Sequence, residues 1–164
     1  MSSATEEIGE HIVALLPRLR RFARSLSRNQ HDADDLVQSA VERAWRNLGQ
    51  FKPGANLAAW MFGIMKNAWI DNRRAHARRG EVALPEDSGE HPAISPDEAN
   101  ATLWSISEAM HQLPEEQRLA IALVMVEGMS YKEAAGVLEI PIGTLTSRLA
   151  RGRDALAAAL GDPL

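Results

Sequence analysis

Apolar residues recur along the first half of this chain at intervals of three and four, which is the spacing of one helix face. The pattern predicts helices over residues 8–26, from about 32 to 48, and from 57 to about 74. Pro17 lies inside the first of them and is expected to kink or split it, because proline removes a backbone hydrogen bond. Asn56 is a suitable N-cap for the third.

The second half shows the same periodicity with clear start signals. A capping box with proline at the first helical position begins at Ser95, and a second capping box begins at Ser130. Further helices are predicted from about 114 to 126, from 131 to about 138, and from 144 to about 160. The turn before the last of these helices contains glycine and proline.

Between residues 77 and 94 the periodicity disappears, and glycine, proline and acidic residues predominate. This composition is typical of a linker, and we expect it to be flexible and acidic. The sustained period-2 alternation of strands is not found in the sequence. We therefore predict an all-α protein with two small helical domains, residues 1–76 and 95–164, joined by the linker 77–94.

The amino-acid composition excludes several classes of protein. The chain has 164 residues, of which 45% are hydrophobic and 24% charged, as in ordinary globular proteins. With 0 cysteines it forms no disulfide, zinc finger or thiol nucleophile. Its longest apolar runs fall well short of the ~18–20 residues of a membrane span, and its first residues lack the pattern of a signal peptide. We expect a cytoplasmic protein.

The net charge of −4 conceals an uneven distribution. Residues 1–76 contain 11 basic and 8 acidic side chains, residues 77–100 contain 2 and 6, and residues 101–164 contain 5 and 8. A nucleic-acid footprint is a local feature, so the basic first segment remains compatible with DNA binding.

The sequence gives little support to catalysis. The five histidines are scattered, and none of the nucleotide-binding, zinc-protease or serine-hydrolase motifs is present. The acidic run at 31–35 superficially resembles a set of metal ligands, but acids at a helix start more often complement the helix dipole. We therefore expect no enzyme activity, no metal and no cofactor.

The two C-terminal helices have the lengths and the turn of a helix-turn-helix, whose second helix lies in the DNA major groove. At the start of that second helix, the backbone N–H of Thr144 is available to a phosphate. Ser147 and Arg151 share one face with Arg148 beside them, and arginine binds guanine through two hydrogen bonds. The alternative is a helical hairpin that packs on itself with solvated arginines.

The third predicted helix and the loop before it mix aromatic and basic side chains. Trp60, Phe62 and Trp69 lie among Lys52 and Lys66, a combination that suits unstacked bases and a phosphate track. The alternative is that these aromatic residues close the hydrophobic core. The sequence favours that alternative for Trp60, which falls on the apolar stripe.

Several segments, taken in order, resemble the bacterial sigma-70 family. Residues 32–38 (DADDLVQ), 42–45 (ERAW), 51–54 (FKPG) and 59–64 (AWMFGI) are similar to its N-terminal conserved domain. Its C-terminal domain is matched by 113–118 (LPEEQR), 128–135 (GMSYKEAA) and 140–153 (IPIGTLTSRLARGR). The chain resembles the small two-domain members, the extracytoplasmic-function (ECF) group, over about residues 8–160. Residues 16–26 (LPRLRRFARSL) also resemble its general-stress branch.

The resemblance implies a promoter-specificity subunit whose partners are core RNA polymerase, promoter DNA and an inhibitory anti-sigma factor. The polymerase would be bound by Asp34, Asp35, Gln38 and Glu42. The melted minus-ten element would be held by Lys52, Asn56, Trp60, Lys66, Asn67, Asp71 and Arg73. The minus-thirty-five element would be read by Thr144, Ser147, Arg148 and Arg151.

The chain departs from the family pattern at a few positions. Ser39 stands where many members have Glu, and Leu145-Thr146 where many have Val-Lys, which removes one expected phosphate contact. Gly152 stands where Ala is common and should weaken the helix by roughly 1 kcal/mol. Two rival classes remain: a sigma mimic that binds an anti-sigma protein without starting transcription, and a dimeric helix-turn-helix regulator that binds DNA unaided.

Overall fold

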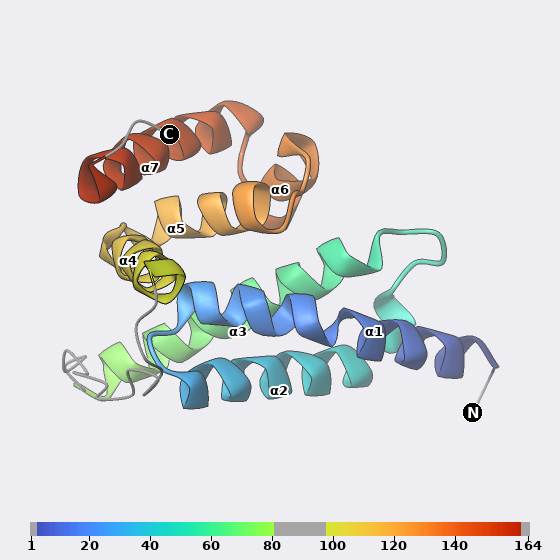
Figure 1. The fold of residues 1–164 in the computed structure, drawn as a ribbon. Helices are drawn as coiled ribbons and strands as arrows, with labels where there is room; N and C mark the ends of the chain where they lie inside the picture. The colour runs from blue at the N-terminus through green and yellow to red at the C-terminus, as the bar shows by residue number, and fades with distance from the viewer. Residues whose placement is uncertain (1–2, 81–97, 162–164) are drawn as a thin grey trace.

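The computed structural model describes residues 3–80 and 98–161, and every regular element in these ranges is helical. Figure 1 shows two layers, with the N-terminal helices α1–α3 together and α4–α7 packed on one side of them. We call these the N-terminal half and the C-terminal half. The predicted all-α class is confirmed. Most of the predicted linker, together with the Ser95 capping box, lies outside the described residues.

Three helices and one short turn form the N-terminal half. They are α1 (Ser3–Leu26), α2 (Gln30–Arg46), the 3-10 turn η1 (Leu48–Gln50) and α3 (Leu57–Arg78). The apolar stripes of the three α-helices meet in a core that includes Leu19, Phe22, Leu36, Met61 and Met65, each at most 1% exposed. The predicted cap of α3 is confirmed, since the side chain of Asn56 accepts from the backbone N–H of Ala59 at 3.2 Å.

Three details differ from the sequence predictions. Of the kink or split expected at Pro17, the split does not occur, because α1 runs through it as one helix. α3 continues to Arg78, four residues past its predicted end and two past the predicted domain boundary at 76. α2 begins at Gln30 rather than near 32, since the Asn29 side chain caps it by accepting from the Asp32 N–H at 2.7 Å.

Trp45 follows the helical spacing of the apolar residues of α2, but its side chain is 49% exposed. The far edge of the indole ring, at Cζ3 and Cη2, faces Gly9 of α1, where an added Cβ would lie 3.1 Å from Cζ3. The absence of a side chain at position 9 thus leaves room for the ring edge against α1.

The C-terminal half contains four α-helices and one π-helical turn. They are α4 (Glu98–Gln112), α5 (Glu115–Ile121), the π-helix η2 (Ala122–Val126), α6 (Tyr131–Leu138) and α7 (Ile142–Leu160). The α6 start is confirmed, because the Ser130 hydroxyl accepts from the Glu133 N–H at 3.1 Å. α6 ends at Leu138, and its C-cap Glu139 adopts a left-handed conformation with φ 56°. Short α6, a turn and long α7 form the predicted helix-turn-helix.

Gly152 has a packing role that its helix propensity does not reveal. It lies buried where α7 crosses α5, and a Cβ at this position would come within 2.9 Å of Cγ1 of Ile121. Because α5 and α7 pack closely here, a larger residue must push them apart.

We expect Gly152→Ala to lower the free energy of unfolding by about 1–2 kcal/mol. Overpacking costs roughly 1–3 kcal/mol and outweighs a helix-propensity gain of about 1 kcal/mol. Gly136→Ala in α6 is the matched control, since a Cβ there meets nothing within 4 Å and the change should be stabilising. Urea unfolding followed by circular dichroism measures both variants. Stabilisation by both would contradict the close approach of α5 and α7.

The two halves contact each other directly. α1 packs against α4, α5 and η2, and α3 packs against α6. Among the described helices, none combines the length and the hydropathy that a membrane span requires.

Candidate nucleic-acid and protein interfaces

One face of α2 carries the four residues predicted to bind polymerase. Asp34, Asp35, Gln38 and Glu42 are all exposed on this helix, while Leu36, Val37 and Ala40 are buried beneath them. Gln38 donates to Glu42 at 3.3 Å, one helical turn further on. The face therefore presents negative and polar groups on a helix held firmly by its opposite side.

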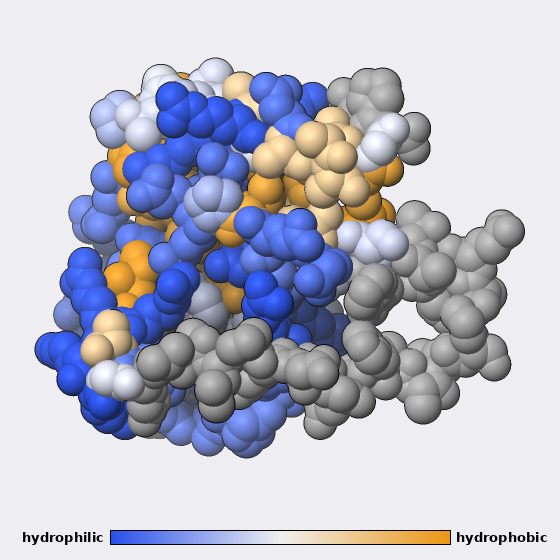
Figure 2. All heavy atoms as spheres, turned by 90° about the vertical axis from the view of Figure 1, so that its left-hand side faces the viewer, coloured by the Kyte–Doolittle hydropathy of each residue, from blue (hydrophilic) through white to orange (hydrophobic). Residues whose placement is uncertain are grey.

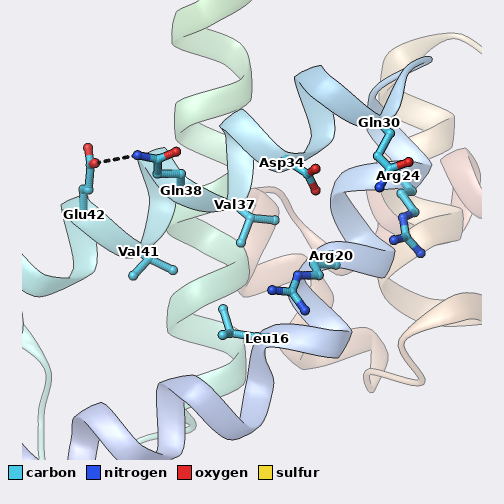
Figure 3. A pocket seen from close by; sticks show the side chains of 9 residues that line it. All are labelled: Leu16, Arg20, Arg24, Gln30, Asp34, Val37, Gln38, Val41 and Glu42. Atoms are coloured by element: carbon cyan, nitrogen blue, oxygen red, sulfur yellow. Dashed lines mark hydrogen bonds between the residues drawn. The ribbon is translucent and has the colours of Figure 1, made fainter.

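A groove runs between this face and α1 (Figure 3). It has a volume of about 520 Å³. Its α1 wall carries Leu16, Arg20 and Arg24, and its α2 wall is apolar along Val37 and Val41. Asp34, Gln38 and Glu42 also line it, whereas Asp35 does not and lies 3.4 Å from His31 instead. A groove that combines apolar residues with charged side chains from both helices suits a helix or coiled coil from a partner protein.

The loop before α3 places Phe51 next to Trp60, which is one of the predicted minus-ten residues. Trp60 is half-buried, and its ring centroid lies 5.3 Å from that of Phe51. Lys52 is exposed in the same loop, and Asn56 at its end is exposed as well. This corner therefore holds a half-buried aromatic ring and an exposed cation in the loop that leads to it.

Phe62 and Lys66 of α3 are both buried. Phe62 is 0% exposed and meets Phe22 edge-on, with centroids 5.0 Å apart, so of the two interpretations left open for it the structure supports the core residue over base stacking. Lys66 is only 5% exposed, although its position lies off the main apolar stripe. Helix α6 of the other half packs against α3, and Glu139 at its end lies 3.4 Å from Nζ of this lysine.

The remaining predicted minus-ten residues lie toward the end of α3. Asn67, Asp71 and Arg73 are exposed. Asp71 accepts from Arg43 of α2 at 3.0 Å, which ties the two helices together. Arg73 lies with its guanidinium 5.8 Å from the centre of the Trp69 ring, a cation–π contact.

Helix α7 presents the predicted minus-thirty-five residues. Ser147 and Arg151 are exposed, and Thr144 and Arg148 are partly exposed. Leu145, Leu149 and Leu156 are buried on the opposite side. Arg148 lies 3.9 Å from Glu116 of α5, a distance that leaves it loosely held. This is the arrangement in which a recognition helix is fixed by its apolar face and leaves its polar face free.

Four glutamates of the C-terminal half reach the N-terminal half, and we call them the bridging carboxylates. Glu127 is the most buried, with a side chain 0% exposed, and it accepts from Nε and Nη2 of Arg21 at 2.8 Å each. Arg18 lies 3.4 Å from the same carboxylate. The hydrogen bond to Glu127 raises the pKa of Arg21. The bridging carboxylates are Glu115, Glu127, Glu133 and Glu139.

The side chains that the other three carboxylates contact are predicted minus-ten residues or neighbours of them. Sequence reasoning did not predict these contacts, because the residues are far apart in the chain and no local pattern connects them. Glu115 pairs with Arg73 at 3.1 Å and accepts from Nε1 of Trp69 at 2.5 Å. Glu133 accepts from Asn56 at 2.7 Å. Glu139 lies 3.4 Å from Nζ of Lys66.

A histidine lies at the same boundary between the halves. The backbone carbonyl of His111 accepts from Arg28 at 3.3 Å, and its Nδ1 lies 3.1 Å from Nη1 of Arg118. Burial lowers the pKa of His111 to about 4, and the positive charges of Arg118 and Arg28 act in the same direction. Burial also lowers the pKa of Arg118.

This histidine should make the stability of the protein depend on pH. Its pKa is about 4 when folded and 6.5 when free, so between these values the unfolded chain binds the proton more readily. Its contribution to stability is therefore complete above pH 6.5 and is lost as the pH falls toward 4. Urea unfolding across this pH range should show a decline in the free energy of unfolding. In the variant His111→Gln this decline should be smaller. An equal decline in both proteins would contradict this role.

The side-chain clusters were also tested as metal sites. Within residues 3–80 and 98–161, no group of three or more histidine, aspartate or glutamate side chains is arranged to hold a metal ion. The acidic start of α2 instead forms local contacts, such as that between His31 and Asp35.

Figure 2 shows that the face formed by the left-hand side of Figure 1 is mostly hydrophilic, with separate hydrophobic patches.

The chain matches known proteins over most of its length. Residues 11–79 match sigma-70 region 2, and residues 103–156 match sigma-70 region 4. Over 156 residues the chain is 37% identical to the ECF RNA polymerase sigma factor EcfG of Rhodopseudomonas palustris. That alignment covers 95% of this chain and 86% of the relative.

Solved structures agree with the sequence matches. The sigma factor RpoE of Bartonella quintana, solved with the anti-sigma factor NepR, superimposes with a TM-score of 0.81 at 33% identity. The match covers 95% of this chain and 98% of that one. CnrH, solved with the cytosolic domain of CnrY, gives a TM-score of 0.71 at 27% identity and coverage of 94% and 87%. This chain belongs to the sigma-70 family and is an ECF sigma factor, a subunit that directs core RNA polymerase to promoters.

Proposed function

We propose that the three exposed faces divide the work of initiation among them. The face of α2 binds the core polymerase, α3 and the loop before it hold the melted minus-ten element, and α7 reads the minus-thirty-five element as duplex. The observation that supports this most directly is the exposure of Asp34, Gln38 and Glu42 along one groove, with α2 anchored by its buried side.

We propose a separate function for each half. Residues up to about 80 act as the polymerase-binding and minus-ten unit, and residues from about 95 act as the minus-thirty-five unit. Residues 77–94 serve as an acidic tether between the two units, apart from the stretch to Arg78 that is the end of α3.

Strand opening follows from the chemistry of the α3 corner. An unstacked base loses a few kcal/mol, and an aromatic face with a nearby cation offsets this loss. We assign these roles to Trp60 and Lys52. The sigma factor family is not a family of enzymes, and we infer that this chain likewise leaves phosphodiester chemistry to the polymerase.

We also infer that an anti-sigma protein regulates the chain in the cytoplasm, where core polymerase works. Its structural relative RpoE was solved with the anti-sigma factor NepR, and CnrH was solved with the cytosolic domain of CnrY. The partner would act by covering polymerase-facing surfaces of one or both halves.

Polymerase binding is tested by changing the α2 face. The triple variant Asp34→Ala, Gln38→Ala, Glu42→Ala should bind core polymerase about tenfold more weakly, equivalent to roughly 1.4 kcal/mol. Glu6→Ala with Glu7→Ala is the control, since it removes the same two charges from the exposed start of α1. Affinity is measured by fluorescence anisotropy with labelled protein. Equal binding by both variants would exclude α2 as the docking face.

A further inference from the structure

The outward face of α7 carries two residues that the proposed roles leave unused. Thr146 and Ala150 are both exposed and stand one helical turn apart on this face. Ser147 and Arg151, which are also exposed, form the neighbouring stripe. By its opposite side α7 packs on α4, α5 and α6, and it forms the outer layer of the C-terminal half (Figure 1). The face therefore combines an apolar stripe with a polar one.

The hydroxyl of Thr146 is already engaged within the helix. It donates to the backbone carbonyl of Ile142, one turn earlier, at 2.9 Å. A hydroxyl has one proton to donate, and phosphate oxygens only accept hydrogen bonds. In this conformation Thr146 thus has no proton for the DNA backbone. What it presents to a ligand is its methyl group, beside an oxygen that only accepts.

Ala150 extends this apolar stripe by one turn. Its side chain is a single methyl group, which neither donates nor accepts a hydrogen bond. Residues four positions apart are separated by about 6 Å along a helix, which corresponds to roughly two base-pair steps of ~3.4 Å. The methyl groups of Thr146 and Ala150 therefore reach base pairs that are neighbours or next neighbours in the duplex.

The major groove offers one group that matches a methyl-bearing stripe. Among the four bases, thymine alone presents a methyl group there, and the other distinguishing groups are hydrogen-bond donors and acceptors. Contact between two methyl groups removes apolar surface from water. A methyl group placed against a donor or acceptor instead leaves that polar group without a partner, which is costly. The stripe therefore favours thymine and disfavours the other bases.

The polar stripe has a different chemistry and a definite end. Arg151 has the two donors that guanine accepts, and Ser147 both donates and accepts. Asp154, one turn after Ala150, is exposed on the same side, and its carboxylate is repelled by DNA phosphates. The surface suited to reading bases therefore ends near Arg151.

We propose that Thr146 and Ala150 read thymine methyl groups in the minus-thirty-five element, beside the guanine contact of Arg151. The inference rests on the proposed role of α7. It gives a function to Thr146, which stands where many family members have lysine. A lysine adds phosphate affinity that is the same for every sequence, whereas a methyl contact adds affinity for particular bases. The chain exchanges general DNA affinity for discrimination at this position.

Replacing thymine with uracil removes only the methyl group and tests the contact from the DNA side. The probe is a fluorescein-labelled duplex of a promoter identified by run-off transcription, titrated with holoenzyme that contains the full chain. Deoxyuridine replaces every thymidine of the minus-thirty-five segment, in both strands. Each buried methyl contact contributes a factor of about 4, so we expect binding to weaken about tenfold. The control duplex carries deoxyuridine in the spacer between the two promoter elements and should bind within about twofold of the unmodified promoter.

Variants of Thr146 test the same contact from the protein side. Thr146→Ser removes the methyl group and keeps the hydroxyl, so the uracil penalty should fall from about tenfold to about threefold, because one contact cannot be lost twice. Thr146→Val retains a methyl group and should retain the full penalty. Thr146→Lys should tighten binding to promoter and non-promoter duplexes equally and steepen the salt dependence by about one phosphate contact.

Two results would overturn the inference. One is a uracil penalty of the same size in the minus-thirty-five segment and in the spacer. The other is a penalty that Thr146→Ser leaves unchanged.

Failure of the proposed role of α7 gives a different pattern. If α7 does not read the element, Arg151→Ala leaves promoter binding unchanged and uracil has no effect, so the role and the inference fail together. If only the methyl contacts are wrong, Arg151→Ala weakens promoter binding while uracil has no effect.

Discussion

Replacing Phe62 with alanine is expected to lower the free energy of unfolding by about 3–5 kcal/mol, the usual cost of emptying a buried aromatic site. Its side chain is 0% exposed, packs edge-on against Phe22 and lies under the guanidinium of Arg18, 5.4 Å from the ring centre. Truncation therefore leaves a cavity between α1 and α3 and removes a cation–π contact. Urea unfolding measures the loss.

Trp60→Ala provides the comparison within the same helix. Trp60 is half-buried at the end of α3 that meets the loop, so its loss should cost less stability than that of Phe62. It should instead reduce promoter opening, measured by permanganate reactivity of unpaired thymines in the holoenzyme complex. Stability losses of equal size, with normal promoter opening by Trp60→Ala, would contradict the assignment of these two aromatic residues.

Arg151→Ala should weaken promoter recognition by the holoenzyme by about 1–3 kcal/mol, the discrimination of one bidentate contact to guanine. Arg151 is exposed on the outer face of α7, whose inner face is fixed by Leu145 and Leu149. Competitive binding to promoter and non-promoter duplexes measures the effect. The loss should be confined to promoter DNA, because a base contact carries sequence information and a phosphate contact does not.

Arg153→Ala is the matched control for this prediction. Arg153 is exposed on the same helix and carries the same charge, but two residues of helix turn it about 200° away from Arg151. It should change promoter and non-promoter binding little and equally. If Arg153→Ala lost promoter specificity and Arg151→Ala did not, the recognition face would lie elsewhere on α7.

Local chemistry explains which features could be predicted from the sequence. The caps at Asn56 and Ser130 depend on side chains within three residues of their partners, and both were predicted correctly. The helical class follows from periodicity alone. The resemblance to sigma factors placed the candidate residues on helices whose outer faces are exposed, as for Gln38 and Arg151.

Other errors have a different cause, since they depend on neighbours distant in the chain. Lys66 is buried and lies beside Glu139 at the end of α6, and nothing near position 66 indicates this. Gly152 weakens a helix by its propensity, yet it permits the close approach of Ile121. The contacts of the bridging carboxylates, such as that of Glu127 with Arg21, join residues about a hundred positions apart and have no local signal.

Run-off transcription with purified core RNA polymerase on fragmented genomic DNA from the source organism tests the central claim most directly. With this chain present, we predict defined transcripts that are absent with core polymerase alone, and their start sites would identify both promoter elements. Absence of such transcripts while core binding persists would contradict initiation and favour a sigma mimic. Absence of both transcripts and core binding would contradict the proposed polymerase-binding role of α2 as well.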